Sequence, residues 1–151
     1  MTGGLLRRDI LAALPLSTAP SLAAAKDTTM KSRPINPTDS SYAQAMEVSD
    51  FKRLVFVSGQ VPADAQDKVP QTFREQARLA WSNVAAQLAE AGLGLTSIVK
   101  VTIFLSDRKY RRENYEVRHE VLGGHSPALT IIICGIYDEA WLLEIEAVAA
   151  G

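Results

Sequence analysis

The segment from Gln71 to Gly92 constrains the fold most strongly, because its apolar residues recur at spacings of three and four. That period gathers them on one face of an α-helix, and an apolar helical face needs another surface to cover it. The residues of this face are Phe73, Ala77, Ala80, Trp81, Val84, Leu88 and Ala91. Gly92 and Gly94 provide a typical C-terminal stop. We therefore expect an amphipathic helix packed on a layer of other elements.

Strand-like runs on both sides of this helix predict that layer. They are Ala45–Ser49, Leu54–Ser58, Ile98–Leu105, Leu129–Ile136 and Trp141–Ala149. Residues 49–52 predict a hairpin turn between the first two runs, and residues 137–139 a turn between the last two. Asp107 is placed to cap a second helix that runs to about Leu122, where Gly123 and Gly124 end it. The order β-β-α-β-α-β-β predicts an α+β fold in which two helices cover one face of a mixed sheet.

The sheet face without helices is expected to be unusually apolar. Ile131, Ile133, Leu143 and Ile145 fall in the last two strand-like runs, and we expect them to contribute to this face. A large apolar surface exposed to water favours association with a partner. The pattern therefore predicts an oligomer.

One compact domain accounts for the length of 151 residues, of which 47% are hydrophobic. The net charge of -1, without a basic run, argues against nucleic acid or a membrane surface as a partner. Cys134 is the only cysteine, so no intramolecular disulfide can form, and we interpret it as a small buried hydrophobe rather than a nucleophile. His119 and His125 are too few and badly spaced for a metal site, no carboxylate–histidine cluster accompanies them, and no phosphate-binding glycine loop occurs. We expect no cofactor.

The first 25 residues have the pattern of a secretory leader. Arg7 and Arg8 form a charged start, a moderately apolar stretch follows from Ile10 to Leu22, and residues 23–25 are alanines that suit a cleavage site. The arginine pair and the weak hydrophobicity resemble a twin-arginine signal, which predicts a periplasmic or otherwise exported protein. The alternative is a disordered tail on a cytoplasmic protein. Residues 26–40 are polar and are interpreted as a linker, which leaves residues 41–151 as the folded domain.

Short motifs follow one another in a fixed order along nearly all of the chain after Pro37. They are Tyr42-Ala43-Gln44-Ala45, Leu54-Val55-Phe56-Val57-Ser58-Gly59-Gln60-Val61-Pro62, Asn83, Val99-Lys100-Val101-Thr102-Ile103-Phe104-Leu105, Asn114, Pro127 and Leu143-Glu144-Ile145-Glu146-Ala147-Val148-Ala149. In order and spacing they resemble the Rid family, also named YjgF or reactive-intermediate deaminases. The resemblance implies a chorismate-mutase-like fold and a homotrimer with a cleft between each pair of subunits.

The same resemblance implies a reaction and a set of site residues. Many family members hydrolyse reactive enamines and imines, such as 2-aminoacrylate, to a keto acid and ammonia. The tyrosine that closes the family's pocket corresponds to Tyr42, and the backbone turn that lines it to Ser58 and Gly59. The family's asparagine corresponds to Asn114, and the glutamate that holds the attacking water to Glu144.

One position departs from the family's pattern. Its P-A-R-[ST] signature carries an arginine that pairs with the substrate carboxylate, and here Leu129 stands in place of that arginine. Ile131 follows where deaminating members often have cysteine. A bound carboxylate would lose its partner, and the pocket would be more apolar, so we expect a less acidic ligand. The alternative is that Arg118 or His125 supplies a cation from a neighbouring element.

Two functions follow from these residues. Retention of Glu144 and Tyr42 favours a Rid-type hydrolase with an altered substrate, since a carboxylate in an apolar cleft suits acid–base chemistry. The change at Leu129 favours a non-catalytic trimer that binds a small molecule outside the cytoplasm. Structural roles are the alternatives for the individual residues: a strand carboxylate for Glu144, a packed aromatic ring for Tyr42 and a helix-face hydrogen bond for Asn114.

Overall fold

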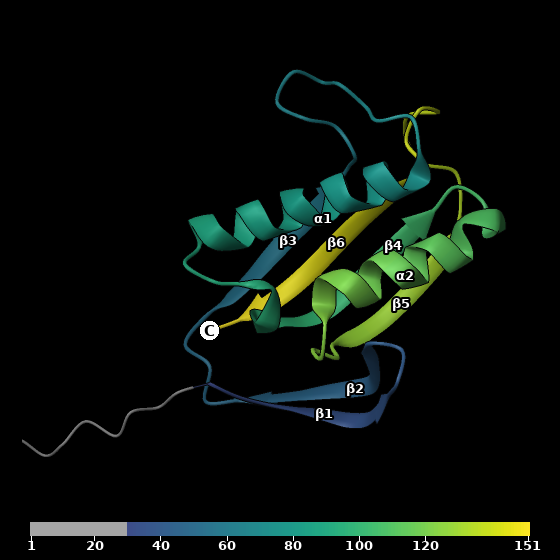
Figure 1. Cartoon of the computed structure of the whole chain (residues 1–151). Helices are drawn as coiled ribbons and strands as arrows, with labels where there is room; N and C mark the ends of the chain where they lie inside the picture. The colour runs from purple at the N-terminus through teal and green to yellow at the C-terminus, as the bar shows by residue number, and fades with distance from the viewer. Residues whose placement is uncertain (1–29) are drawn as a thin grey trace, which may run out of the picture.

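The computed structural model describes residues 30–151, which form one mixed sheet with two helices on one of its faces (Figure 1). The elements are β1 (Lys31–Thr38), β2 (Tyr42–Ser49), β3 (Leu54–Gln60), α1 (Phe73–Glu90), β4 (Ile98–Leu105), α2 (Arg111–Leu122), β5 (Ala128–Ile133) and β6 (Leu143–Ala150). The predicted α+β fold, with two helices on one face, is thereby confirmed. The predicted leader, residues 1–25, lies outside the described residues. Neither helix of the described part is long and apolar enough to cross a membrane.

The sheet has the strand order β1-β2-β5-β4-β6-β3. Strand β5 runs parallel to both of its neighbours, β2 and β4, whereas the remaining pairs are antiparallel. Helix α1 packs on β3 and β6, and α2 lies beside it over β4 and β5 (Figure 1). The sheet is therefore well covered in its centre, while β1 and β2 extend beyond the helices.

The first strand corrects the interpretation of residues 26–40 as a linker. Lys31–Thr38 forms β1, which pairs antiparallel with β2 along nearly its whole length. Its sequence contains Pro34 and Pro37 and little apolar character, so no local pattern indicates a strand. Prolines are tolerated there because β1 is an edge strand, where one row of backbone groups needs no ladder partner.

The predicted hairpin between residues 45–49 and 54–58 is also wrong. Strands β2 and β3 are neighbours in the chain but belong to opposite parts of the sheet, since β2 pairs with β1 and β5 whereas β3 pairs with β6. The backbone N–H groups of Lys52 and Arg53 both donate to the carbonyl oxygen of Gly151, which ties the connection to the chain end rather than to a tight turn. Pairing partners far apart in sequence leave no local signal.

Side-chain caps from the sequence start α1 and the 3-10 turn that precedes α2. The Thr72 side chain accepts a hydrogen bond from the backbone N–H of Glu75, and the Glu75 carboxylate accepts one from the backbone of Thr72, so α1 starts in a capping box. Asp107 caps a single 3-10 turn, which passes directly into α2. Helix α2 ends at Gly123, whose φ of 55° suits glycine.

The core lies between the helices and the sheet, and it corrects the expected location of two apolar residues. Leu143 and Ile145 were expected on the uncovered face, yet both are fully buried under the helices. Ile131 and Ile133 also face the helix side, because they pair with the buried residues Ile103 and Leu105 of β4. Ile131 and Ile133 themselves remain partly exposed. The alternation in β5 and β6 therefore has the opposite phase to the one expected.

The face without helices is nevertheless apolar at several positions. Phe56 is 74% exposed, and Leu54 and Ile132 are more than two-fifths exposed. Cross-strand pairing aligns Phe56 with Val148, and Phe104 with Ile132, on this same face. We call it the open face. Its composition keeps the expectation of an oligomer, now based on a different set of residues.

Candidate functional site

The site residues expected from the sequence, apart from Asn114, fall into two groups. Tyr42, Leu129 and Ile131 line a pocket of about 430 Å³ on the helix side of the sheet. We call it the helix-side pocket, and its remaining lining residues are Ser40, Arg111, Tyr115 and Arg118. Gly59 lies against Glu144 where β3 meets β6, and its neighbour Ser58 lines a hollow on the open face; we call these three residues the β3–β6 corner.

Three elements build the helix-side pocket. Tyr42 is the first residue of β2, and α2 supplies the arginines and Tyr115. Leu129 and Ile131 alternate along β5 and pair with Val101 and Ile103, which directs them to the helix side. The pocket therefore has an apolar wall on the sheet and a cationic wall on α2.

Arg118 is the most buried charged group of this pocket, with only 3% of its surface exposed. One guanidinium nitrogen donates to the carbonyl oxygen of Ser40 at 2.9 Å, whereas Nε has no partner within the described residues. The guanidinium carbon lies 5.6 Å from the centre of the Tyr115 ring, within the range of a cation–π contact. Burial lowers the pKa of Arg118, and Tyr115 and Tyr42 partly oppose that change. An arginine still remains charged at neutral pH.

The β3–β6 corner depends on a glycine. A Cβ atom on Gly59 would lie 1.7 Å from Oε1 of Glu144, so the carboxylate occupies the space that any other side chain would fill. The pairing of β3 with β6 shifts register between Val57 and Gln60, which allows this close approach. Glu144 pairs with Phe104 across β4 and alternates with buried Leu143 and Ile145, so its carboxylate belongs to the open face.

The two groups are on opposite faces of the sheet within one chain. Leu129 faces the helix side and Glu144 the open face, and β4 separates their strands. The expectation that Glu144 shares an apolar cleft with Leu129 and Ile131 therefore has no counterpart inside a single subunit. A site that contains both groups requires a second copy of the chain.

Asn114 and His125, which were also named from the sequence, do not line the helix-side pocket. Asn114 is buried in α2, and neither polar atom of its side chain has a partner in residues 30–151. Nε2 of His125 lies 2.7 Å from the carbonyl oxygen of Ile98, within hydrogen-bonding distance. Of the two cations considered as substitutes, Arg118 is the one that the fold brings beside Leu129.

Arg111 and Tyr115 are pocket residues that sequence reasoning missed. Together with Arg118 they occur at spacings of four and three, which places all three on one face of α2. That spacing was visible in the sequence. The spacing alone does not predict a site, because the pocket forms only where this face of α2 meets the start of β2 and strand β5.

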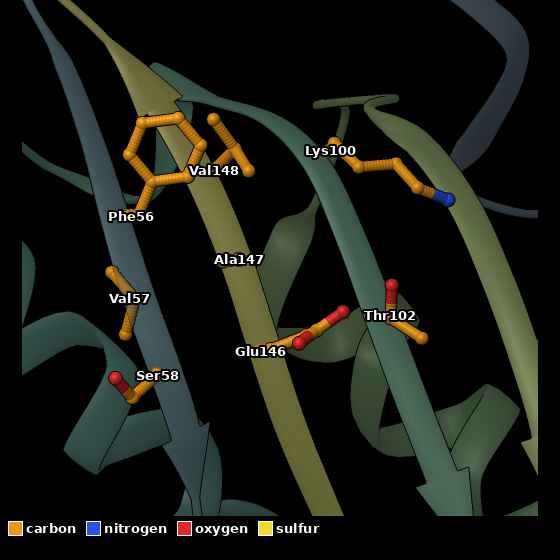
Figure 2. Close-up of a pocket in the computed structure, with 8 residues that line it drawn as sticks. All are labelled: Phe56, Val57, Ser58, Lys100, Thr102, Glu146, Ala147 and Val148. Carbon is orange, nitrogen blue, oxygen red and sulfur yellow. The ribbon is translucent and has the colours of Figure 1, made fainter.

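A second hollow, of about 270 Å³, lies on the open face (Figure 2). The Glu146 carboxylate points toward Thr102 across the gap between β6 and β4, with Phe56 and Val148 at one end (Figure 2). Burial lowers the pKa of Lys100, which also lines the hollow, and nearby Glu146 partly opposes this. In the part of the chain that the structure describes, no three His, Cys, Asp or Glu side chains gather as metal ligands.

Comparisons with known proteins agree with this fold. A family model described as Endoribonuclease L-PSP matches residues 31–151. A RutC family protein of Pyrococcus abyssi is 34% identical over 119 residues, which cover 78% of this chain and 88% of the relative. Escherichia coli TdcF, named a putative reactive intermediate deaminase, is 33% identical over 66% of this chain and 81% of its own length.

Solved structures extend the same similarity. The Rid family protein YyfB of Yersinia pestis superposes with a TM-score of 0.70 over 80% of this chain and 98% of its own, at 20% identity, which supports the fold alone. The structure of Escherichia coli TdcF with bound serine gives a TM-score of 0.63 at 31% identity, covering 73% of this chain and 87% of that one. The first strand, β1, is included in the family match.

Proposed function

Because the chain belongs to the Rid family, also named YjgF or L-PSP, we propose that it hydrolyses an imine or enamine in clefts between the subunits of a homotrimer. The observation that carries the proposal is the Glu144 carboxylate, which lies against Gly59 on a sheet face that is open to another molecule. A carboxylate held in this way can position and deprotonate water.

The trimer is supported by two independent features. The open face exposes Phe56, Leu54 and Ile132, which are costly to leave in water. The residues carried over from the family also divide between opposite faces of the sheet, so only a neighbouring subunit can complete a cleft that contains both groups. In this proposal the β3–β6 corner of one subunit faces the helix-side pocket of the next.

The proposed reaction needs no cofactor. Glu144 takes a proton from water as the water oxygen bonds to the carbon of the C=N group, and the carboxylic acid returns that proton to nitrogen. The hydroxyl proton of the resulting carbinolamine then passes to the same nitrogen, the C–N bond breaks and ammonia leaves. The products are one carbonyl compound and one ammonia for each imine and water consumed.

The substrate is proposed to differ from the 2-imino acids with short side chains that the family resemblance implies. Leu129 and Ile131 form an apolar wall, which favours a substrate with an apolar substituent. The change at Leu129 also favours the second candidate function, a non-catalytic trimer that holds a small ligand. These two candidates differ in whether the bound molecule is consumed.

A hydrolysis assay separates the two candidates. An amino acid oxidase releases imines from a panel of amino acids, and their disappearance is followed by trapping with semicarbazide. We expect the wild type to accelerate hydrolysis of at least one imine, and Glu144→Gln to lose about 100-fold or more of that rate. The control is Glu146→Gln, on the same strand and face two residues further along. No acceleration with any imine, or an equal loss in the control, would overturn the catalytic proposal.

We also propose that the first 25 residues export the protein by the twin-arginine route, on the strength of Arg7, Arg8 and the alanines at 23–25. Replacing both arginines by lysine should retain the chain in the cytoplasm, as measured by cell fractionation. Unchanged delivery of this double variant would contradict the route, and an unprocessed cytoplasmic wild type would contradict export itself.

A further inference from the structure

Arg118 is a buried cation that has no carboxylate partner among residues 30–151. Side-chain ion pairs in residues 30–151 involve other basic residues, and neither Arg118 nor Arg111 takes part in one. The single hydrogen bond that Arg118 makes to the Ser40 carbonyl satisfies one of its five N–H donors, and the buried Nε has no partner in this part of the chain. A guanidinium removed from water without a counter-charge is costly, so its burial at this position favours an anionic ligand.

The geometry directs this cation into the helix-side pocket. Arg118 and Arg111 both line it, and Tyr115 lies between them on α2, with its ring within cation–π distance of Arg118. Arg118 is buried whereas Arg111 is exposed, so the positive charge extends from the inside of the pocket to its rim. Arg112 is adjacent in sequence yet does not line the pocket, and it pairs instead with Glu116.

We propose that Arg118 binds the carboxylate of the substrate, with Arg111 at the rim of the pocket, and that α2 thereby supplies the cation that β5 lacks at Leu129. This inference deepens the proposed function and rests on it for the identity of the reaction. The substrate class is an imine or enamine that carries one carboxylate and an apolar substituent. The carboxylate meets the arginines of α2, and the apolar substituent packs on Leu129 and Ile131.

This proposal changes the ligand that is inferred from Leu129. From the sequence, loss of the arginine predicted a less acidic ligand, because nothing placed another cation nearby. In the structure Leu129 and Arg118 line the same pocket from two different elements. The anion is therefore recognised from the helix, and the strand provides apolar contact in its place.

Calorimetric binding of a product analogue tests the inference without depending on turnover. The probe is 3-methyl-2-oxobutanoate, which carries a carboxylate and a branched apolar group, and its neutral amide is the comparison. With the full chain, we expect the acid to bind at least about 10-fold more tightly than the amide. Arg118→Met should weaken binding of the acid by about 10- to 100-fold and leave binding of the amide nearly unchanged.

Two further variants separate recognition from a structural role. Arg112→Met is the matched control on the same helix and should bind the acid like wild type, because Arg112 lies outside the pocket. Adding Leu129→Arg to Arg118→Met should restore preference for the acid over the amide, which a merely structural arginine could not explain. Arg118→Lys, which keeps the charge but loses the planar fork, should bind the acid with intermediate affinity and serves if the methionine variant does not fold.

The possible outcomes distinguish the two proposals. If Arg118→Met still hydrolyses imino acids and binds the keto acid at wild-type strength, the inference is wrong and the proposed function stands. If the keto acid binds through Arg118 but no imine is hydrolysed, the anion site stands and the catalytic proposal falls. Equal affinity of the wild type for the acid and the amide would overturn the inference directly.

Discussion

The two faces of the sheet differ in how complete they are. On the helix side, α1 and α2 bury an apolar core, and α2 forms the cationic wall of the helix-side pocket opposite the apolar wall on β5. On the open face the Glu144 carboxylate lies over Gly59, several apolar side chains are exposed, and no helix or strand of residues 30–151 covers them. The helix side is therefore complete within residues 30–151, whereas the open face would be covered only in the proposed trimer. The chemistry proposed for this protein needs both.

The largest expected effect comes from preventing association at the open face. Phe56→Asp places a charge on the most exposed apolar side chain of that face, and burying it in an interface would be strongly unfavourable. We expect a folded monomer in light scattering and loss of imine hydrolysis, since neither group of site residues is complete alone. Tyr137→Asp is the control, because Tyr137 is 95% exposed in the loop between β5 and β6. A wild-type protein that is a stable monomer at micromolar concentration would contradict both the proposed trimer and the role of the open face in association.

A substitution at Gly59 tests the corner without disturbing the fold. Gly59→Ala adds a Cβ where the Glu144 carboxylate now lies, so the flexible end of Glu144 must move away. We expect activity to fall by about 10- to 1,000-fold while the thermal midpoint changes little, because displacing a catalytic base is costly in rate but not in packing. Gly135→Ala, where the added Cβ meets nothing within 4 Å, is the matched control. A fully active Gly59→Ala variant would mean that the carboxylate does not act from this position.

The two faces were also unequally predictable from sequence. The helix from Gln71 and the strand Ile98–Leu105 have local periods, and both were found nearly to their ends. Strand β1 was missed because its prolines and polar residues show no period, and the β2–β3 hairpin was wrong because pairing is decided by residues far away in the chain. Glu144 and Gly59 could be named from motifs. Arg118 could be named only as one of two candidate cations, with His125, because the choice between them depends on how α2, β2 and β5 meet in space.

A gain of function at Leu129 sharpens the comparison from the helix side. Leu129→Arg adds a second guanidinium to a pocket that already holds Arg118, so we expect it to improve hydrolysis of a small imino acid such as 2-iminopropionate by about 10-fold. Like charges in one pocket should also lower the thermal midpoint of the free protein, and carboxylate ligands should reverse that loss. The gain should disappear in Leu129→Arg/Glu144→Ala. A folded but silent Leu129→Arg protein would favour the binding role over catalysis.

The smallest effect on stability is expected from the N-cap of α1, which belongs to the helix side and lies outside both groups of site residues. Thr72→Ala removes the N-cap of α1, which should lower the free energy of unfolding by about 1 kcal/mol and the midpoint by a few degrees, without loss of assembly or activity. The effect should depend on pH in a definite direction. Hydrogen bonds from Thr72 lower the pKa of Glu75 below its ordinary 4.5 in the folded state, so this contribution is present above that pH and is lost as the pH falls through the folded value.

The difference in midpoint between wild type and Thr72→Ala should therefore be largest near neutral pH and shrink as the solution is acidified below about 4.5. Scanning calorimetry across this range measures it, and Gln71→Ala is the control, because Gln71 is an exposed neighbour outside the capping box. A difference in midpoint that stays constant with pH would mean that the Glu75 carboxylate does not contribute to the stability that the cap provides. A loss of trimer in Thr72→Ala would mean that the covered and the open face are not independent, and that the helices contribute to assembly as well as to the core.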